Sequence, residues 1–549
     1  MWGSKGFLIL VNDKPTQIDA ATILSQIPVN TIEKIEMITA PSDRYDADGK
    51  AGIINIVTKK GSIDGISLST NLQYGLPRIK EYFNAEEPQR YGADVSLNYR
   101  KNKLDLGLAL NYLRNDIAGR RVGDVNTTIG DIFTSFPSEG ERSLKRENYG
   151  FRAPATYYLN DKNELNAGAY LGHRDQYRLA DIYYNNTKTD LNNNTVIGQS
   201  QYFNSNLVLK SGTFKVFNLD YLHRFDETSS LSLSALYENA LIEGWTKNRN
   251  LTIDNFNDTL QYTLNNGYNP LKAFRAKIDY EKTVVHGKLS VGYQLRNQLQ
   301  DRAFDYLEKE ENDEAFVVYP EFTGSISVLN RIHGLYPQYA GQVNKLKFSG
   351  RLRFENAYRR FSDDRGGEPF ELPLSNLFPS ASLRYNFSDT WALKAAYSRR
   401  VQRSTNNELN PYPEREHSET LEQGDPRIRP EFIGLYEVGL SKDFKKATFY
   451  WNIYHQNIQD IVNRVNSVYN DTILNRIYTN AGRAKLTGSD LGATLSPIKN
   501  LKAFLGGNIY NLEIRGFLFE NALEVSSRGW VYAVYSNISY QITTKASLT

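Results

Sequence analysis

The chain has 549 residues, a hydrophobic fraction of 40% and a formal net charge of +3. No uninterrupted apolar run approaches the roughly 18 residues that a membrane-spanning helix requires, which excludes a helical membrane protein. The absence of Cys excludes disulfides, thiolate metal sites and cysteine nucleophiles, and the near-neutral charge does not indicate a nucleic acid partner.

The first 60 residues predict a small α/β unit. Phe7–Val11 is expected to form a short strand, and Ala20–Gln26 a short helix that follows an N-capping aspartate and ends before a proline. Ile32–Thr39 and Ile53–Lys59 have the composition of two further strands. The Asp- and Gly-containing stretch 46–49 between them is expected to be a turn. It only faintly resembles a calcium-binding loop, because the twelfth position of such a loop offers no Glu.

From about residue 62 onward the sequence alternates between apolar and polar residues. In the segment 346–354, for example, Leu346 and Phe348 share one face with Leu352, while Arg351 and Arg353 lie on the other. Successive side chains of a strand point to opposite sides, so each such segment has one apolar and one polar face. Soluble β-sandwiches also show this alternation, so the pattern alone does not distinguish a soluble β-sandwich from a membrane β-barrel.

The lengths of the connections favour a membrane barrel. Long irregular connections are expected at 115–144, 178–205, 246–267, 302–335, 362–376, 404–429 and 464–481. Short turns are expected between them, near Asn102, Asp161, Asp226, Val285, Asn344, Ser388, Lys445, Ile498 and Thr543. Short turns at one end and long loops at the other are typical of outer-membrane β-barrels. Nine turns joining two strands each predict an all-β fold, a large antiparallel transmembrane barrel with about eighteen strands.

The segment 32–61, IEKIEMITAPSDRYDADGKAGIINIVTKKG, resembles the last part of the plug domain of TonB-dependent outer-membrane receptors. Tyr45, Gly49, Gly52 and Asn55 occupy positions of that motif. The resemblance implies that residues 1–61 are the C-terminal part of a plug, a partial α/β domain, and that residues 62–549 are the barrel.

A second resemblance lies at 406–440 and is to the outer-membrane β-barrel family that accompanies such plugs. The residues that match its motif are Asn410, Pro411, Gly424, Asp425, Pro426, Pro430 and Glu431. Barrels of this kind have twenty-two strands, so about four are expected to be missing here. The signal peptide, the TonB box and the first half of the plug are also expected to be missing, which implies a chain that is truncated at both ends.

The resemblance implies a receptor or transporter that takes up a siderophore, cobalamin, a glycan or a peptide by TonB-dependent active transport. Its implied location is the outer membrane of a Gram-negative cell. Its implied partners are outer-membrane lipid, the TonB energy-transducing complex, a small ligand and a surface lipoprotein. A plug must block so wide a lumen, and Arg351, Arg353 and Arg384 are candidates for holding it.

No catalytic, metal-binding or cofactor-binding residues are expected. The six His show no metal-ligand spacing, and the acidic run 301–314 is expected to be a solvated loop. Candidate ligand contacts are the loop aromatics Trp245, Tyr268, Tyr336 and Tyr412, although interfacial girdle or loop packing is the favoured explanation for most of them. Two other functions remain open, a passive channel or surface-binding barrel without TonB coupling, and a soluble β-rich binding protein.

Overall fold

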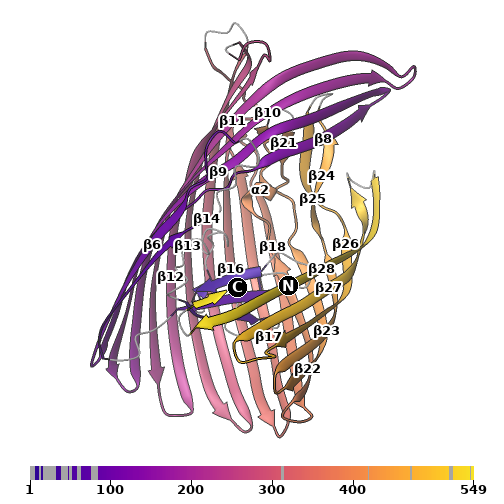
Figure 1. Ribbon diagram of the computed structural model, residues 1–549. Helices are drawn as coiled ribbons and strands as arrows, with labels where there is room; N and C mark the ends of the chain where they lie inside the picture. Colours follow the sequence, from indigo (N-terminus) through magenta and orange to yellow (C-terminus); the bar gives the residue numbers. More distant parts are fainter. Residues whose placement is uncertain are drawn as a thin grey trace.

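In the computed structural model the chain is almost entirely β-structure (Figure 1). The structure describes residues 7–548, with the exception of residues 12–13, 16–31, 39–46, 49–51, 59–63, 76–83, 257, 311–314, 418–419, 470–472, 519–522 and 544–545. None of the helices in these described residues has the length and hydropathy to cross a membrane.

A small N-terminal sheet precedes the barrel. It contains β1 (Phe7–Val11), β2 (Lys14–Pro15), β3 (Ile32–Ile38) and β4 (Gly52–Thr58) in the order β2-β1-β4-β3. The pairing of β1 with β4 is parallel and that of β3 with β4 is antiparallel. The three strands predicted from the sequence are therefore confirmed. The predicted helix at residues 20–26 lies outside the described residues.

Most of the remaining strands form one antiparallel sheet that closes into a barrel. Its members on the N-terminal side are β5 (Gly65–Tyr74), β6 (Arg90–Lys101), β7 (Leu104–Asn115), β8 (Arg120–Ile129), β9 (Ile132–Asn160), β10 (Asn163–Asp190), β11 (Thr195–Arg224), β12 (Ser229–Leu251), β13 (Thr259–Val284) and β14 (Gly287–Glu310). The others are β15 (Val317–Val318), β16 (Gly324–Val343), β17 (Leu346–Asp363), β18 (Phe370–Asn386), β19 (Trp391–Gln402), β22 (Glu431–Phe444), β23 (Ala447–Gln459), β26 (Arg483–Leu495), β27 (Leu501–Leu518), β28 (Leu523–Thr543) and β29 (Ala546–Leu548).

All nine predicted short turns join consecutive antiparallel strands. Asn102, His286 and Asn344 adopt positive φ angles of 53°, 59° and 50°, as tight hairpin connections require. The count of about eighteen strands omitted β5, β8 and β15, because none of these three strands borders one of the nine predicted turns.

The long irregular connections were a wrong prediction in most places, because the strands continue through them. β10 runs to Asp190 and β11 starts at Thr195, so the expected loop 178–205 is a hairpin with a short turn. The acidic stretch 301–310 likewise belongs to β14 rather than to a loop. Figure 1 shows β8 to β11 extending beyond the rest of the wall and curving to one side. Beyond the membrane these strands carry polar side chains on both faces. The apolar and polar alternation that marks a strand in the sequence is therefore lost there, although the strand continues.

The barrel wall has the two faces that the alternation predicts. On β17, Arg351, Arg353 and Glu355 are buried on the lumen side, whereas Leu352 and Phe354 are 45% and 44% exposed on the outer side. Because this outer face carries large apolar groups without a protein partner, lipid is the solvent that suits it.

A second small sheet lies at the end of the barrel opposite the short turns. It contains β20 (Glu414–His417), β21 (Thr420–Gln423), β25 (Leu474–Asn480) and β24 (Val462–Val468) in that order. The four-residue helix α2 (Asn406–Leu409) precedes it and has a capping box between Thr405 and Glu408. This part of the chain carries the second sequence motif.

Candidate functional site

The N-terminal sheet is held inside the barrel, and we call β1 to β4 with Ala47 and Asp48 the lumenal sheet. Figure 1 shows it enclosed by the wall beside β16. Ile9 and Ile56 of the lumenal sheet form a buried apolar cluster with Phe214, Ala240 and Leu271 of β11, β12 and β13. Apolar burial therefore fixes one side of the lumenal sheet to the wall.

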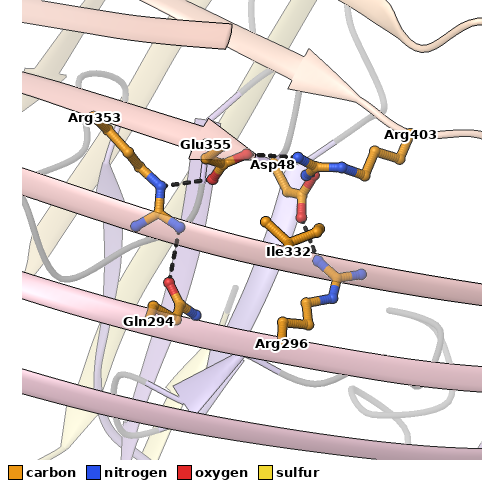
Figure 2. Close-up of a pocket in the computed structure, with 7 residues that line it drawn as sticks. All are labelled: Asp48, Gln294, Arg296, Ile332, Arg353, Glu355 and Arg403. Atoms are coloured by element: carbon orange, nitrogen blue, oxygen red, sulfur yellow. Dashed lines mark hydrogen bonds and ion pairs between the residues drawn. The ribbon is translucent and has the colours of Figure 1, made fainter. Parts of the chain in front are cut away.

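A second attachment is made by charges around Asp48, which we call the Asp48 centre (Figure 2). Its Oδ2 accepts a hydrogen bond from Arg296 Nη1 of β14 at 2.6 Å, and its Oδ1 forms an ion pair with Arg403. Arg400 of β19 donates to the Asp48 backbone oxygen. The Val401 amide donates to the Ala47 oxygen at 3.0 Å. One short segment is thus bound by β14 and by the end of β19.

A second carboxylate extends this network along the barrel wall. Arg403 Nη2 contacts Glu355 Oε2 at 2.6 Å, and Arg353 Nε contacts Glu355 Oε1 at the same distance. Arg353 also donates to Gln294 Oε1 at 3.0 Å. Arg353 and Glu355 are almost fully buried. Removing one member of such a buried network leaves its partners as uncompensated charges, which makes the arrangement sensitive to single substitutions.

The sequence analysis identified the lumenal arginines only in part. Arg351 and Arg353 do face the lumen, and Arg353 belongs to the network around Asp48 through its ion pair with Glu355. Arg384 is exposed and donates to Asn386 Oδ1 at 3.2 Å. The residues that contact Asp48 are Arg296, Arg400 and Arg403. The Arg-rich end of β19, RRVQR at 399–403, was a signal that could have pointed to two of them.

The first sequence motif lies only partly within the described residues. Asn55 is fully buried in β4, and its Nδ2 donates to Glu36 Oε2 of β3 at 2.9 Å. Gly52 begins β4 opposite Phe7 of β1. Tyr45 and Gly49 lie outside the described residues. Asn55 therefore joins two strands of the lumenal sheet, which is a positioning role.

The second motif folds into a compact turn at the barrel mouth. Asn410 is buried. Its Nδ2 donates to Glu414 Oε1 at 2.7 Å, and its backbone oxygen accepts from the Gly424 amide at 2.6 Å. The Pro411 oxygen accepts from Gln423 Nε2 at 2.8 Å. A Cβ at Gly424 would lie 2.4 Å from the Glu408 oxygen, so only glycine fits there.

The rest of this motif attaches the turn to the wall. Arg359 of β17 donates to the oxygens of Pro426 at 2.9 Å and Ile428 at 2.6 Å. The Asp425 amide donates to the Glu408 oxygen at 2.9 Å. Pro430 is buried just before β22. Glu431, which begins β22, accepts from the Val462 amide at 2.8 Å. These residues act together as a structural cap on one side of the mouth.

The four candidate ligand aromatics are not brought together. By strand alternation Trp245 and Tyr268 lie on the outer faces of β12 and β13, and Tyr268 is 50% exposed. Tyr336 and Tyr412 are buried by protein groups. Tyr336 donates to Asp279 Oδ1 at 2.6 Å, and Tyr412 donates to Asp364 beneath the guanidinium of Arg365. In this structure neither buried ring offers an open face.

Comparison with known proteins identifies the barrel. Residues 223–549, more than half of the chain, match the outer membrane protein beta-barrel family. No curated protein matches the sequence.

Solved structures share the fold at low sequence identity. The siderophore receptor PirA from Pseudomonas aeruginosa has a TM-score of 0.61 and 13% identity, covering 99% of this chain and 87% of that one. A mutant of the ferric enterobactin receptor PfeA from the same organism has a TM-score of 0.62 and 14% identity, covering 100% and 84%. The copper transporter OprC has a TM-score of 0.63 and 11% identity, covering 98% and 83%.

Proposed function

The chain belongs to the outer membrane protein beta-barrel family, and from this premise we propose that it acts as a receptor for TonB-dependent uptake of a small nutrient ligand. As a member of that family it is an integral β-barrel protein of the outer membrane. The similar structures are, by their names, receptors for siderophores and a transporter for copper. At this identity they support the proposal through the shared fold alone.

The observation that carries the proposal is the lumenal sheet inside the barrel. A barrel of this size encloses a lumen that its own side chains cannot fill. The lumenal sheet occupies it and is attached both by an apolar cluster and by the Asp48 centre. We propose accordingly that residues 1–61 are part of a plug and residues 62–549 are the barrel. Energy delivered through TonB would then displace the plug from these two attachments.

The alternative function is a passive channel or surface-binding barrel without TonB coupling. Its lumen would conduct small solutes without an energy source. The ion pairs of Asp48 with Arg296 and Arg403 favour the coupled receptor, because they hold the lumenal sheet to the wall and so keep the lumen occupied. A surface lipoprotein partner stays a prediction from the sequence.

Uptake can be tested before the ligand is identified. Cells with and without the protein are grown in the same rich medium, and mass spectrometry identifies compounds that are depleted only when the protein is present. We expect a protonophore, or deletion of TonB, to abolish this depletion. Depletion that continues under both treatments would instead support the passive channel.

A further inference from the structure

The inner wall of β9, β10 and β11 carries a group of basic side chains. Along these strands the even-numbered residues face the lumen, as the buried side chains Asn148, Ala180, Asn206 and Val208 show. At such positions lie Arg142 and Arg146 of β9, Arg174 and Arg178 of β10, and Lys210 of β11. We call these five residues the basic wall.

The strand register places the basic wall in one continuous area. Gln176 of β10 is paired with Arg146 on one side and with Lys210 on the other, which makes one row across three strands. Arg174 lies in the next inward-facing row toward the lumenal sheet. Arg178 lies in the next inward-facing row away from the lumenal sheet. Arg142 lies one row further, opposite Ala180. Inward-facing rows are about 7 Å apart, so the area extends over about 20 Å along the strands.

The basic wall begins directly above the lumenal sheet. Phe214, which packs against Ile9 and Ile56, is paired with Gly172. The next inward-facing row toward the end opposite the short turns contains Arg174. In outer-membrane barrels the short turns are periplasmic, so the basic wall faces the extracellular vestibule over the plug.

Acidic side chains are not interleaved with the basic wall. The lumen-facing positions between 142 and 152, 170 and 184, and 202 and 216 contain no Asp or Glu. Arg174 donates to Gln176 Oε1 at 2.8 Å, and Arg178 donates to Asn206 Oδ1 at 3.5 Å. The Nε of Arg146 is buried and has no hydrogen-bond partner among the described residues.

We propose that the basic wall binds an anionic ligand above the plug, and this inference rests on the proposed receptor function. Guanidinium groups bind carboxylate and phosphate oxygens in a bidentate geometry, and a partly enclosed lumen strengthens such pairs. Because the basic residues occupy several rows, the ligand carries at least two anionic groups. The inner placement of these residues leaves lipopolysaccharide phosphates on the outer surface out of their reach.

Binding to the purified, folded protein in detergent tests the proposal. The probes are tripolyphosphate and butane-1,2,3,4-tetracarboxylate as polyanions, and maltotriose as a neutral compound of similar size. We expect at least one polyanion to bind, and the variant Arg146→Gln/Arg174→Gln/Lys210→Gln to bind it roughly tenfold or more weakly. The two polyanions separate phosphate from carboxylate recognition. Heat-modifiable migration on a gel verifies that each variant is folded.

Two further variants make the result specific. Lys145→Gln/Arg249→Gln removes two positive charges from the outer faces of β9 and β12, and we expect it to bind like the wild type. Arg146→Lys keeps the charge and tests the need for a guanidinium.

The proposal is overturned if the polyanions bind no more tightly than maltotriose, or if removing the basic wall leaves their affinity unchanged. If a neutral compound is then depleted from the medium, and a protonophore stops this depletion, the receptor function stands and only the anionic nature of the ligand is rejected.

Discussion

Asp48 and Arg296 are separated by 248 residues, yet the carboxylate of the first and the guanidinium of the second are 2.6 Å apart. Both side chains are largely shielded from water, with exposures of 15% and 12%. The contact joins the lumenal sheet to β14 across the barrel interior. Arg403 binds the other oxygen of the same carboxylate, so Asp48 is held both by β14 and by the residue that follows β19.

Replacement Asp48→Asn should weaken the attachment of the lumenal sheet by about 3–5 kcal/mol, because it leaves Arg296 and Arg403 without this counter-charge. The amide nearly preserves the shape of the side chain, so the barrel should still fold. Hydrogen exchange of β4 amides as a function of urea measures the effect. The matched control is Asp64→Asn, an exposed residue whose ion pair with Arg100 is 3.7 Å long. Its effect should stay below about 1 kcal/mol. Equal β4 exchange in wild type and Asp48→Asn would contradict the assigned role.

Replacement Gly424→Ala should loosen the cap at the barrel mouth. The added methyl would lie 2.4 Å from the Glu408 oxygen, which is backbone and has little room to move. We expect a local loss of about 1–3 kcal/mol, detected as faster amide exchange in α2. The control is Gly367→Ala, where a Cβ meets nothing within 4 Å. Unchanged protection of α2 in Gly424→Ala would be inconsistent with the close packing.

Acid should loosen the same cap through Asp364. Burial raises the pKa of this carboxyl, but hydrogen bonds from Tyr412 and Ser325 outweigh that effect and hold its pKa below the usual value. A depressed pKa means that the contribution to stability is present above about pH 4 and is lost as the pH falls through the folded-state pKa. Burial, followed by the contact with Asp364, raises the pKa of Tyr412, so that group stays neutral.

The measurement is amide exchange in residues 406–412 between pH 7 and pH 3, corrected for the intrinsic pH dependence of exchange. Protection in the wild type should fall below about pH 4. Tyr412→Phe removes the donor, and should show lower protection at neutral pH with a smaller acid effect. Identical pH profiles for the two proteins would rule out this coupling.

Replacement Leu219→Arg should impair insertion into lipid. Leu219 is 52% exposed on the outer face of β11, beside other apolar side chains. A cation facing the bilayer interior costs about 2–4 kcal/mol in barrels of this kind. Folding into lipid vesicles, followed by heat-modifiable migration, measures the effect. Leu219→Ala serves as the control and should insert nearly as well as the wild type. Normal insertion of Leu219→Arg would place this position outside the hydrocarbon region.

The sequence predicted the barrel well because its signals are local. Alternation along a strand follows from the two faces of a sheet, and short turns need only a few polar residues, as at Asn102 and Asn344. The same local logic failed for the loops. Outside the bilayer both faces of a strand contact water, so β10 and β11 lose their alternation while their pairing continues.

The candidate site was less accessible to sequence reasoning. Asn410 and Gly424 were found through the resemblance to the barrel family, and the structure gives the physical reason, since close backbone contacts at this turn demand these residues. The role of Asp48 was missed, since its partners Arg296 and Arg403 are hundreds of residues away and lie on strands with many other charges.

By itself the sequence determined that this chain forms long two-faced strands and a small preceding sheet, since side-chain alternation and turn chemistry depend only on near neighbours. Only the tertiary structure decided which lumen-facing charges meet, and that the basic wall lies directly above the lumenal sheet. The physical reason is that strand register and barrel closure bring together residues whose separation along the chain carries no information about their distance in space.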